Sequence, residues 1–265
     1  MKTLNIAKLV MLLLATVLIM SACAPTAPAT EAPATEEPVS EAKVWRIATD
    51  ATYPPFETVD EATKEIVGFD IDLLNAIAEE AGITFELVNV GFDPLLTGMA
   101  QCQYDAAISA MTITEERQKA FSFTNPYINA GQVVTINKET TGVSGVADLA
   151  GKRIGVQIGT TGAIEAEAIE GAEVRTYDTV DLAFQDLANK QVDAVIADYP
   201  TSIAFIMVNP EKLMTTGEVF TAEEYGIAVC KTQTELLDAL NRGLAAVQAN
   251  GLIPELEQKW LSGAE

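Results

Sequence analysis

Segments with strand-like and helix-like patterns alternate along most of this chain, and this alternation constrains its fold more than any other feature. Residues 44–49, 85–90 and 132–137 are rich in β-branched and aromatic residues, which is typical of strands. Residues 69–82 carry apolar residues at helical spacing and stop at a glycine, as an amphipathic helix does. The alternation predicts an α/β fold with mainly parallel sheets.

Two segments of the chain resemble each other. DPLLTGMAQCQYDAAI at 93–108 aligns with DLAFQDLANKQVDAVI at 181–196. Each begins with Asp and reaches Asp-Ala twelve residues later, at Asp105 and Asp193, before an apolar strand. The similarity predicts two lobes of related plan, and chance likeness of two ordinary helix–strand units is the alternative.

The first residues of the chain have the pattern of an export signal. Lys2 and Lys8 precede a 12-residue apolar run at 9–20, and Ser-Ala-Cys23 follows. Twelve residues are too few to span a bilayer as a helix, which takes about 20, so a membrane-spanning anchor is the weaker alternative. IMSAC resembles the bacterial lipobox, which implies a signal peptide over 1–22 and a lipid on Cys23. We therefore expect an extracytoplasmic protein anchored to the cell membrane, at the cell surface or in the periplasm.

A segment rich in Pro, Ala, Thr and Glu separates this leader from the rest of the chain. Residues 23–43 contain almost no bulky apolar side chains, so we expect a disordered tether. The body at 44–265 is long enough for two lobes.

The composition excludes several classes of function. The formal net charge is −22, which excludes a nucleic-acid binder that depends on a basic face. The chain has no histidine, so a Ser-His-Asp triad, a Cys-His dyad and histidine metal sites are all impossible. We expect no metal and no cofactor. Cys102 and Cys230 lack metal-ligand spacing, and we expect free buried thiols rather than a disulfide.

Polar and aromatic residues follow several of the expected strands. In open α/β sheets, ligands bind at the carboxyl ends of the strands, so these residues are expected to meet in one site. The candidates are Asp50, Tyr53, Phe92, Ser109, Ala110, Thr112, Arg117, Gln157, Thr160, Thr161 and Asp198.

These candidates include both a cationic and an anionic side chain. Arginine binds a carboxylate through two parallel hydrogen bonds, so Arg117 predicts an anionic group on the ligand. A buried carboxylate such as Asp198 needs a cationic partner. A free α-amino acid supplies both groups. The alternatives are a surface ion pair of Arg117 with Glu115 or Glu116, a helix cap at Asp198, and purely structural roles for the two aromatic residues.

Five motifs in the body resemble one bacterial family. They are Asp50-Ala-Thr-Tyr-Pro-Pro-Phe-Glu, Gly68-Phe-Asp-Ile-Asp-Leu, Met111-Thr-Ile-Thr-Glu-Glu-Arg117, Gly159-Thr-Thr and Ala194-Val-Ile-Ala-Asp198. The chain resembles the polar amino acid-binding proteins of ABC importers, solute-binding protein family 3, over 44–265. The resemblance implies a two-lobed, type II periplasmic-binding-protein fold with a ligand cleft between the lobes. Lobe 1 would comprise 44–130 and 226–265, and lobe 2 would comprise 131–225.

The resemblance also implies a role for each candidate. The α-carboxylate would be held by Arg117, Thr112 and the amides of Thr160 and Thr161. The α-ammonium would be held by Asp198 and the carbonyl of Ala110, which stands where many relatives have glycine or serine. The ligand side chain would lie between Tyr53 and Phe92, with its far end contacted by Asp50, Ser109, Gln157 and Glu57.

We therefore expect a monomeric receptor that closes around an amino acid and delivers it to an ABC permease in the membrane, with no catalytic residues. Asp50 and the aromatic pair favour a basic amino acid over a polar one such as glutamine. The alternatives are an enzyme of the same fold, similar to periplasmic cyclohexadienyl dehydratase, and a ligand-sensing module.

Overall fold

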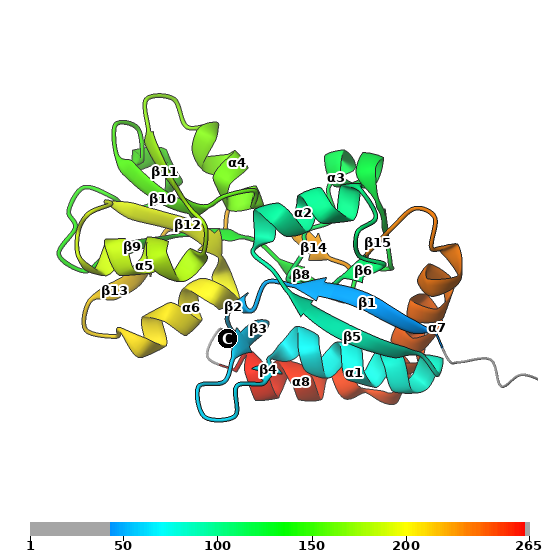
Figure 1. Cartoon of the computed structure of the whole chain (residues 1–265). Helices are drawn as coiled ribbons and strands as arrows, with labels where there is room; N and C mark the ends of the chain where they lie inside the picture. Colours follow the sequence, from blue (N-terminus) through cyan, green and yellow to red (C-terminus); the bar gives the residue numbers. More distant parts are fainter. Residues whose placement is uncertain (1–42, 263–265) are drawn as a thin grey trace, which may run out of the picture. The chain divides into compact units, whose positions relative to one another are not determined.

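Two five-stranded sheets organise residues 43–262, the part of the chain that this computed structural model describes (Figure 1). The expected signal peptide, the expected lipidation site Cys23 and the expected tether lie outside these residues, except for the last residue of the tether. The first sheet has the order β5-β1-β6-β15-β7 and the second has the order β11-β10-β12-β9-β13. Among residues 43–262, none of the helices has the length and apolar character needed to cross a membrane.

In the first sheet, four strands run in one direction and one strand, β15, runs in the opposite direction. The parallel strands are β5 (Thr84–Asn89), β1 (Val44–Thr49) and β6 (Ala106–Ala107). The strand β15 (Ala228–Val229) pairs antiparallel with β6, and β7 (Ser122–Phe123) pairs antiparallel with β15 and so runs in the direction of β6. The last strand along the chain, β15, therefore lies in the same sheet as the first strand, β1.

The second sheet repeats this arrangement. Its parallel strands are β11 (Glu173–Tyr177), β10 (Arg153–Gln157) and β12 (Ala194–Asp198). The strand β9 (Gln132–Asn137) pairs antiparallel with β12, and β13 (Leu213–Thr216) pairs antiparallel with β9 and so runs in the direction of β12. In both sheets, only the fourth strand in the order runs opposite to the other four.

Helices cover both faces of each sheet. The helices beside the first sheet are α1 (Phe69–Ala81), α2 (Phe92–Ala100), α3 (Glu115–Ala120), α7 (Thr234–Asn250) and α8 (Leu252–Trp260). Successive residues of a strand point to opposite faces, so Ala48 packs with Leu95 of α2, while Ile47 packs with Leu73 of α1. Figure 1 shows α2 on one side of β1 and α1 on the other.

The second sheet is covered in the same way. Its helices are α4 (Thr161–Glu167), α5 (Val180–Ala188) and α6 (Tyr199–Val208), with a short 3₁₀ turn at Val146–Asp148. On β12, Ile196 packs with Ala163 of α4, and Val195 packs with Phe184 of α5. Each sheet and its helices form one lobe.

Short strands complete the two lobes and connect them. A three-stranded sheet at the edge of the first lobe contains β2 (Thr52–Tyr53), β3 (Glu57–Val59) and β4 (Ile66–Val67). The chain passes from the first sheet to the second through β8 (Ile128–Ala130) and returns through β14 (Glu223–Tyr225). These two strands pair antiparallel, so the crossings lie side by side.

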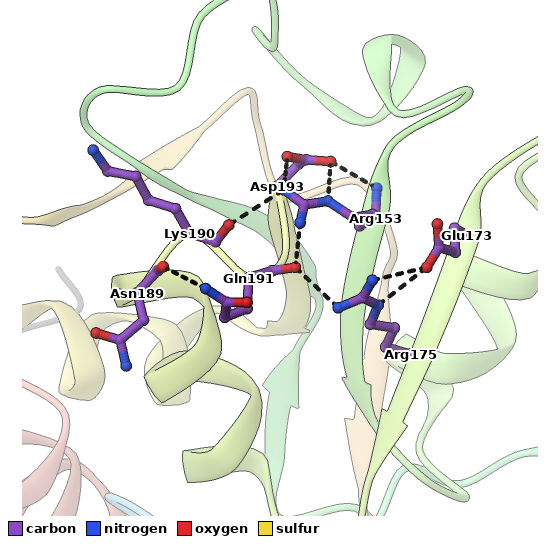
Figure 2. A network of polar contacts seen from close by, with 7 residues as sticks. All are labelled: Arg153, Glu173, Arg175, Asn189, Lys190, Gln191 and Asp193. Atoms are coloured by element: carbon purple, nitrogen blue, oxygen red, sulfur yellow. Dashed lines mark hydrogen bonds and ion pairs between the residues drawn. The ribbon is translucent and has the colours of Figure 1, made fainter.

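A polar network fixes the start of β10 against the start of β12. Figure 2 shows Asp193 accepting hydrogen bonds from the backbone N–H of Arg153 at 2.9 Å and from its guanidinium at 2.7 Å. The same guanidinium donates to the carbonyl of Gln191, as does that of Arg175. Arg175 also pairs with Glu173.

The first lobe contains the same contact in the same place. Asp105 accepts a hydrogen bond from the backbone N–H of Arg46 at 2.9 Å. Arg46 and Arg153 have the same register, because the residues that follow them, Ile47 and Ile154, pair with Ala106 and Ala194. The two segments that resemble each other in sequence therefore occupy equivalent positions in the two sheets. This equivalence supports the prediction of two lobes of related plan.

Cys102 and Cys230 form a disulfide, with their Cα atoms 5.3 Å apart. The prediction of free thiols is therefore wrong. A separation of 128 residues hides the pairing in the sequence, and the structure explains it. The backbone N–H of Cys230, just after β15, donates to the carbonyl of Asp105, which places the returning chain beside the turn that carries Cys102.

Replacing both cysteines by alanine should lower the free energy of unfolding by about 2–5 kcal/mol, because the bond closes a long loop in the unfolded chain. Urea denaturation of the oxidised protein and the double variant measures this difference. Reductant should destabilise the oxidised protein and leave the double variant unchanged. Equal stability of all samples would contradict the pairing.

Candidate functional site

All eleven candidate residues from the sequence analysis line one cavity. It is lined by Asp50, Tyr53, Phe92, Ser109, Ala110, Thr112, Arg117, Gln157, Thr160, Thr161 and Asp198. The residues come from both lobes and lie at or just beyond the carboxyl ends of β1, β6, β10 and β12, or at the helices that follow. The topology therefore brings strand ends from two sheets to a single place. Glu57, a further candidate, does not line this cavity.

Asp50 is a buried carboxylate at the end of β1. It accepts hydrogen bonds from the backbone N–H of Phe92 at 3.1 Å, from Gln157 Nε2 at 2.7 Å and from Thr52 Oγ1 at 2.7 Å. Burial raises the pKa of Asp50, and these hydrogen bonds oppose the rise. The bond to Gln157 joins a residue of the first sheet to one of the second.

Arg117 directs its guanidinium into the cavity. Nη1 donates to the carbonyl of Thr112 at 2.8 Å, and Nη2 donates to the carbonyl of Gly159 at 3.0 Å. The guanidinium carbon lies 5.3 Å from the ring centre of Phe92. Burial lowers the pKa of Arg117, while nearby carboxylates raise it. These contacts exclude the alternative of a simple surface ion pair.

Asp198 is the second buried carboxylate of the cavity. It accepts hydrogen bonds from the hydroxyl of Tyr53 and from Gln132 Nε2, the latter at 3.0 Å. Burial, and secondarily the charge of Glu223, raise the pKa of Asp198 to about 6. Asp198 occupies the cap position of α6, but its side chain makes no capping hydrogen bond. Its carboxylate therefore faces the cavity rather than the helix.

Thr160, Tyr53 and Phe92 make contacts that stabilise the fold as well as lining the cavity. Thr160 caps α4 by accepting the backbone N–H of Ala163 at 3.1 Å. Tyr53 and Phe92 both pack in hydrophobic clusters and both line the cavity, so their structural role leaves each of them placed to contact a ligand.

This chain is similar to the proteins of a known family. A family model described as bacterial extracellular solute-binding proteins, family 3, matches residues 45–263. The chain belongs to this family. The expectation drawn from the five motifs is thereby confirmed.

Two relatives and one solved structure illustrate the similarity. ABC transporter arginine-binding protein 1 of Escherichia coli strain K12 is 39% identical over 216 residues, which cover 79% of this chain and 87% of that protein. L-cystine-binding protein TcyJ of the same strain is 31% identical over 218 residues, covering 81% of each. The solved structure of the arginine-, lysine-, histidine-binding protein ArtJ from Geobacillus stearothermophilus is 36% identical, with a TM-score of 0.78. That match covers 83% of this chain and 96% of ArtJ, and it confirms the expected fold.

This solute-binding protein has a further acidic residue that the sequence analysis missed. Glu223 lies on the returning strand β14, where its Oε2 accepts hydrogen bonds from Thr112 Oγ1 at 2.5 Å and Thr161 Oγ1 at 2.9 Å. The two hydroxyls come from different lobes, so one carboxylate connects both to the crossing segment. The search after each strand could not find Glu223, because it lies within a crossing strand.

Gln132 is a second residue that the sequence analysis missed. It is fully buried at the start of β9, and its Nε2 donates to Asp198 at 3.0 Å and to Thr161 at 3.1 Å. Gln132 therefore orients both a carboxylate and a hydroxyl of the cavity. Within residues 43–262, no group of three or more histidine, cysteine or carboxylate side chains could hold a metal ion.

Asp198→Asn should stabilise the ligand-free protein at pH 8, on the order of 1–3 kcal/mol, and have little effect at pH 4. The pKa of Asp198 is raised to about 6, so the native state favours the protonated acid. Its contribution to stability is present below pH 4 and lost as the pH rises through 6. Urea denaturation at pH 4, 6 and 8 measures the difference.

Asp193→Asn is the matched control, because Arg153 lowers the pKa of Asp193. That variant should lose stability at pH 8 rather than gain it. A destabilising effect of Asp198→Asn at pH 8 would contradict the raised pKa.

Proposed function

We propose that this protein captures an amino acid with a cationic side chain, arginine or lysine, and delivers it to an ABC importer. One observation carries the choice of ligand: the cavity has one carboxylate more than a neutral amino acid needs. Arg117 would pair with the α-carboxylate and Asp198 with the α-ammonium. Asp50 then pairs with neither of these two groups of the ligand. A buried carboxylate is stabilised by a positive group beside it.

The surroundings of Asp50 support this assignment. Gln157 uses its Nε2 to donate to Asp50, while its Oε1 is buried without a partner. That end of the cavity thus offers a carboxylate and an amide oxygen, both acceptors. A guanidinium carries five N–H donors and an ammonium three, whereas the side-chain amide of glutamine has two donors and no charge.

Charge in the wider site favours the same ligand class. The carboxylates of Asp198 and Glu223 lie near enough to Arg117 to act on its charge, and Asp50 lines the same cavity. The ligand names of the relatives are consistent with this proposal, because two of the three proteins compared above are named for binding arginine.

Closure of the lobes would complete the site. We assign residues 44–130 with 226–265 to one lobe and 131–225 to the other, with β8 and β14 as the hinge. Sheet membership supports this division. A closed cleft excludes water and strengthens the charged contacts with the ligand.

Delivery and anchoring are further parts of the proposal. A lipid on Cys23 would hold the protein at the outer face of the cell membrane, beside its permease. The protein would act there as a monomer and make or break no covalent bond in the ligand.

Thermal melting with a panel of amino acids tests the ligand class. Protein stripped of ligand by unfolding and refolding should melt at a higher temperature with arginine or lysine. Binding to the native state at about 1,000 times Kd adds about 4 kcal/mol. Arg117→Ala and Asp198→Ala should each abolish the shift. If no amino acid raised the melting temperature, cyclic carboxylic acids would be tested next.

Asp50→Asn tests the charge argument separately. The variant keeps the shape of the side chain and removes its charge, so arginine affinity should fall by about ten-fold or more. Glutamine affinity should change much less. Calorimetric titration with both ligands measures the ratio, and an equal loss for the two would contradict a charge-reading role for Asp50.

A further inference from the structure

The Gly68-Phe-Asp-Ile-Asp motif contributes no residue to the cavity lining. Its glycine has a φ of 145°, and a Cβ atom there would lie 2.0 Å from the carbonyl oxygen of Phe56. Only glycine therefore lets the start of α1 approach this part of the chain so closely. The approach brings Asp70, the second residue of α1, beside Glu57, the first residue of β3. The motif thus places two carboxyl groups together.

These two carboxyl groups are fully buried next to each other, because the backbone N–H of Asp70 donates to the carbonyl of Phe56, the residue before Glu57. Two carboxylates cannot hydrogen-bond unless one carries a proton, since each is otherwise an acceptor only. Each also retains one buried oxygen without a partner, Oε2 of Glu57 and Oδ1 of Asp70. A single proton between the groups would satisfy this geometry.

The charges around the pair favour that proton. Burial raises the pKa of Glu57 well above its ordinary value, and the charges of Asp70 and Asp50 raise it further. Burial raises the pKa of Asp70 to about 6. The other polar groups that face the pair are Ser109, after β6, and Tyr127, before β8. None of these neighbours is a cation.

The pair supports the wall of the cavity directly. Glu57 Oε1 accepts a hydrogen bond from Ser109 Oγ at 2.9 Å, and the same Oγ accepts the backbone N–H of Asp50 at 3.0 Å. Asp70 Oδ2 accepts the backbone N–H of Ala110 at 2.7 Å. Three lining residues are therefore held through two carboxyl groups that stand behind them.

We infer that Glu57 and Asp70 are positioning residues of the binding site, and that one proton held between them keeps Ser109 and Ala110 in place for the ligand. When the proton leaves, two like charges remain in a buried space. Their repulsion disturbs the wall and weakens ligand binding. This inference rests on the proposed function for the identity of the ligand, but the proton itself exists without ligand.

Glu57→Gln is the decisive variant, because its amide donates to Asp70 and accepts from Ser109 as the protonated acid does, and it cannot ionise. At pH 7 its affinity for arginine should stay within about three-fold of the unsubstituted protein, while Glu57→Ala should lose about ten-fold or more. Between pH 7 and pH 9.5 the affinity of the unsubstituted protein should fall by about ten-fold relative to Glu57→Gln. Taking this ratio cancels the titration of the ligand's own amine.

Asp72→Asn is the matched control, since Asp72 lies in the same motif but pairs with Lys259 at the surface. It should leave the pH profile of binding unchanged. A ratio between the unsubstituted protein and Glu57→Gln that stays constant with pH would overturn the inference, even if arginine binds.

Two measurements without ligand separate this inference from the proposed function. Infrared spectra of the full chain at pH 7.5 should contain the carbonyl band of a protonated carboxylic acid, and Glu57→Gln should lose it. The free energy of unfolding should fall less steeply with rising pH in Glu57→Gln, because the native state then binds one proton fewer. Absence of both effects would overturn the shared proton, whatever the ligand proves to be.

Discussion

Negative charge buried around the cavity exceeds the positive charge there, and most features of the site follow from this imbalance. Asp50 and Asp198 are buried in the cavity lining, Glu223 is half-buried beside it, and Arg117 is the one arginine in that lining. Transfer of such groups out of water is costly unless hydrogen bonds and opposite charges compensate. The protein provides hydrogen bonds to every one of these carboxylates. It does not provide the missing positive charge, which leaves that part to a ligand.

The two lobes have equivalent frameworks but place different residues at the cavity. Asp105 and Asp193 fix the start of equivalent strands through the same backbone contact. Five residues later, the equivalent positions at the cavity are Ala110 and Asp198. In the proposed site, Ala110 would offer its backbone carbonyl and Asp198 its carboxylate, so an equivalent framework would present different acceptors to one ligand group. The position of these atoms is thus set by the sheets, and their chemistry by single residues.

Local patterns predicted most of the fold and all eleven lining residues, because each follows a strand whose apolar sequence is visible. The residues and contacts that the patterns missed depend on the direction of a strand or on pairing between residues far apart in the sequence. Gln132 begins a strand, but β9 runs antiparallel to β12, so its first residue lies opposite Asp198 at the same edge. Glu223 lies on a crossing strand, and the disulfide joins residues 128 apart. None of these contacts has a signature in the nearby sequence.

The conformation of Ala110 shows why support behind the site matters as much as the residues that line it. Its φ of 44° is in the left-handed region, which costs a residue other than glycine roughly 1–2 kcal/mol. The hydrogen bond from its N–H to the buried carboxyl group of Asp70 opposes this cost, since a bond to a charged group contributes about 1.5–3 kcal/mol. The two terms are similar in size. The cavity wall therefore keeps its shape only while the carboxyl pair beneath it stays intact, and the geometry of binding depends on residues that no ligand touches.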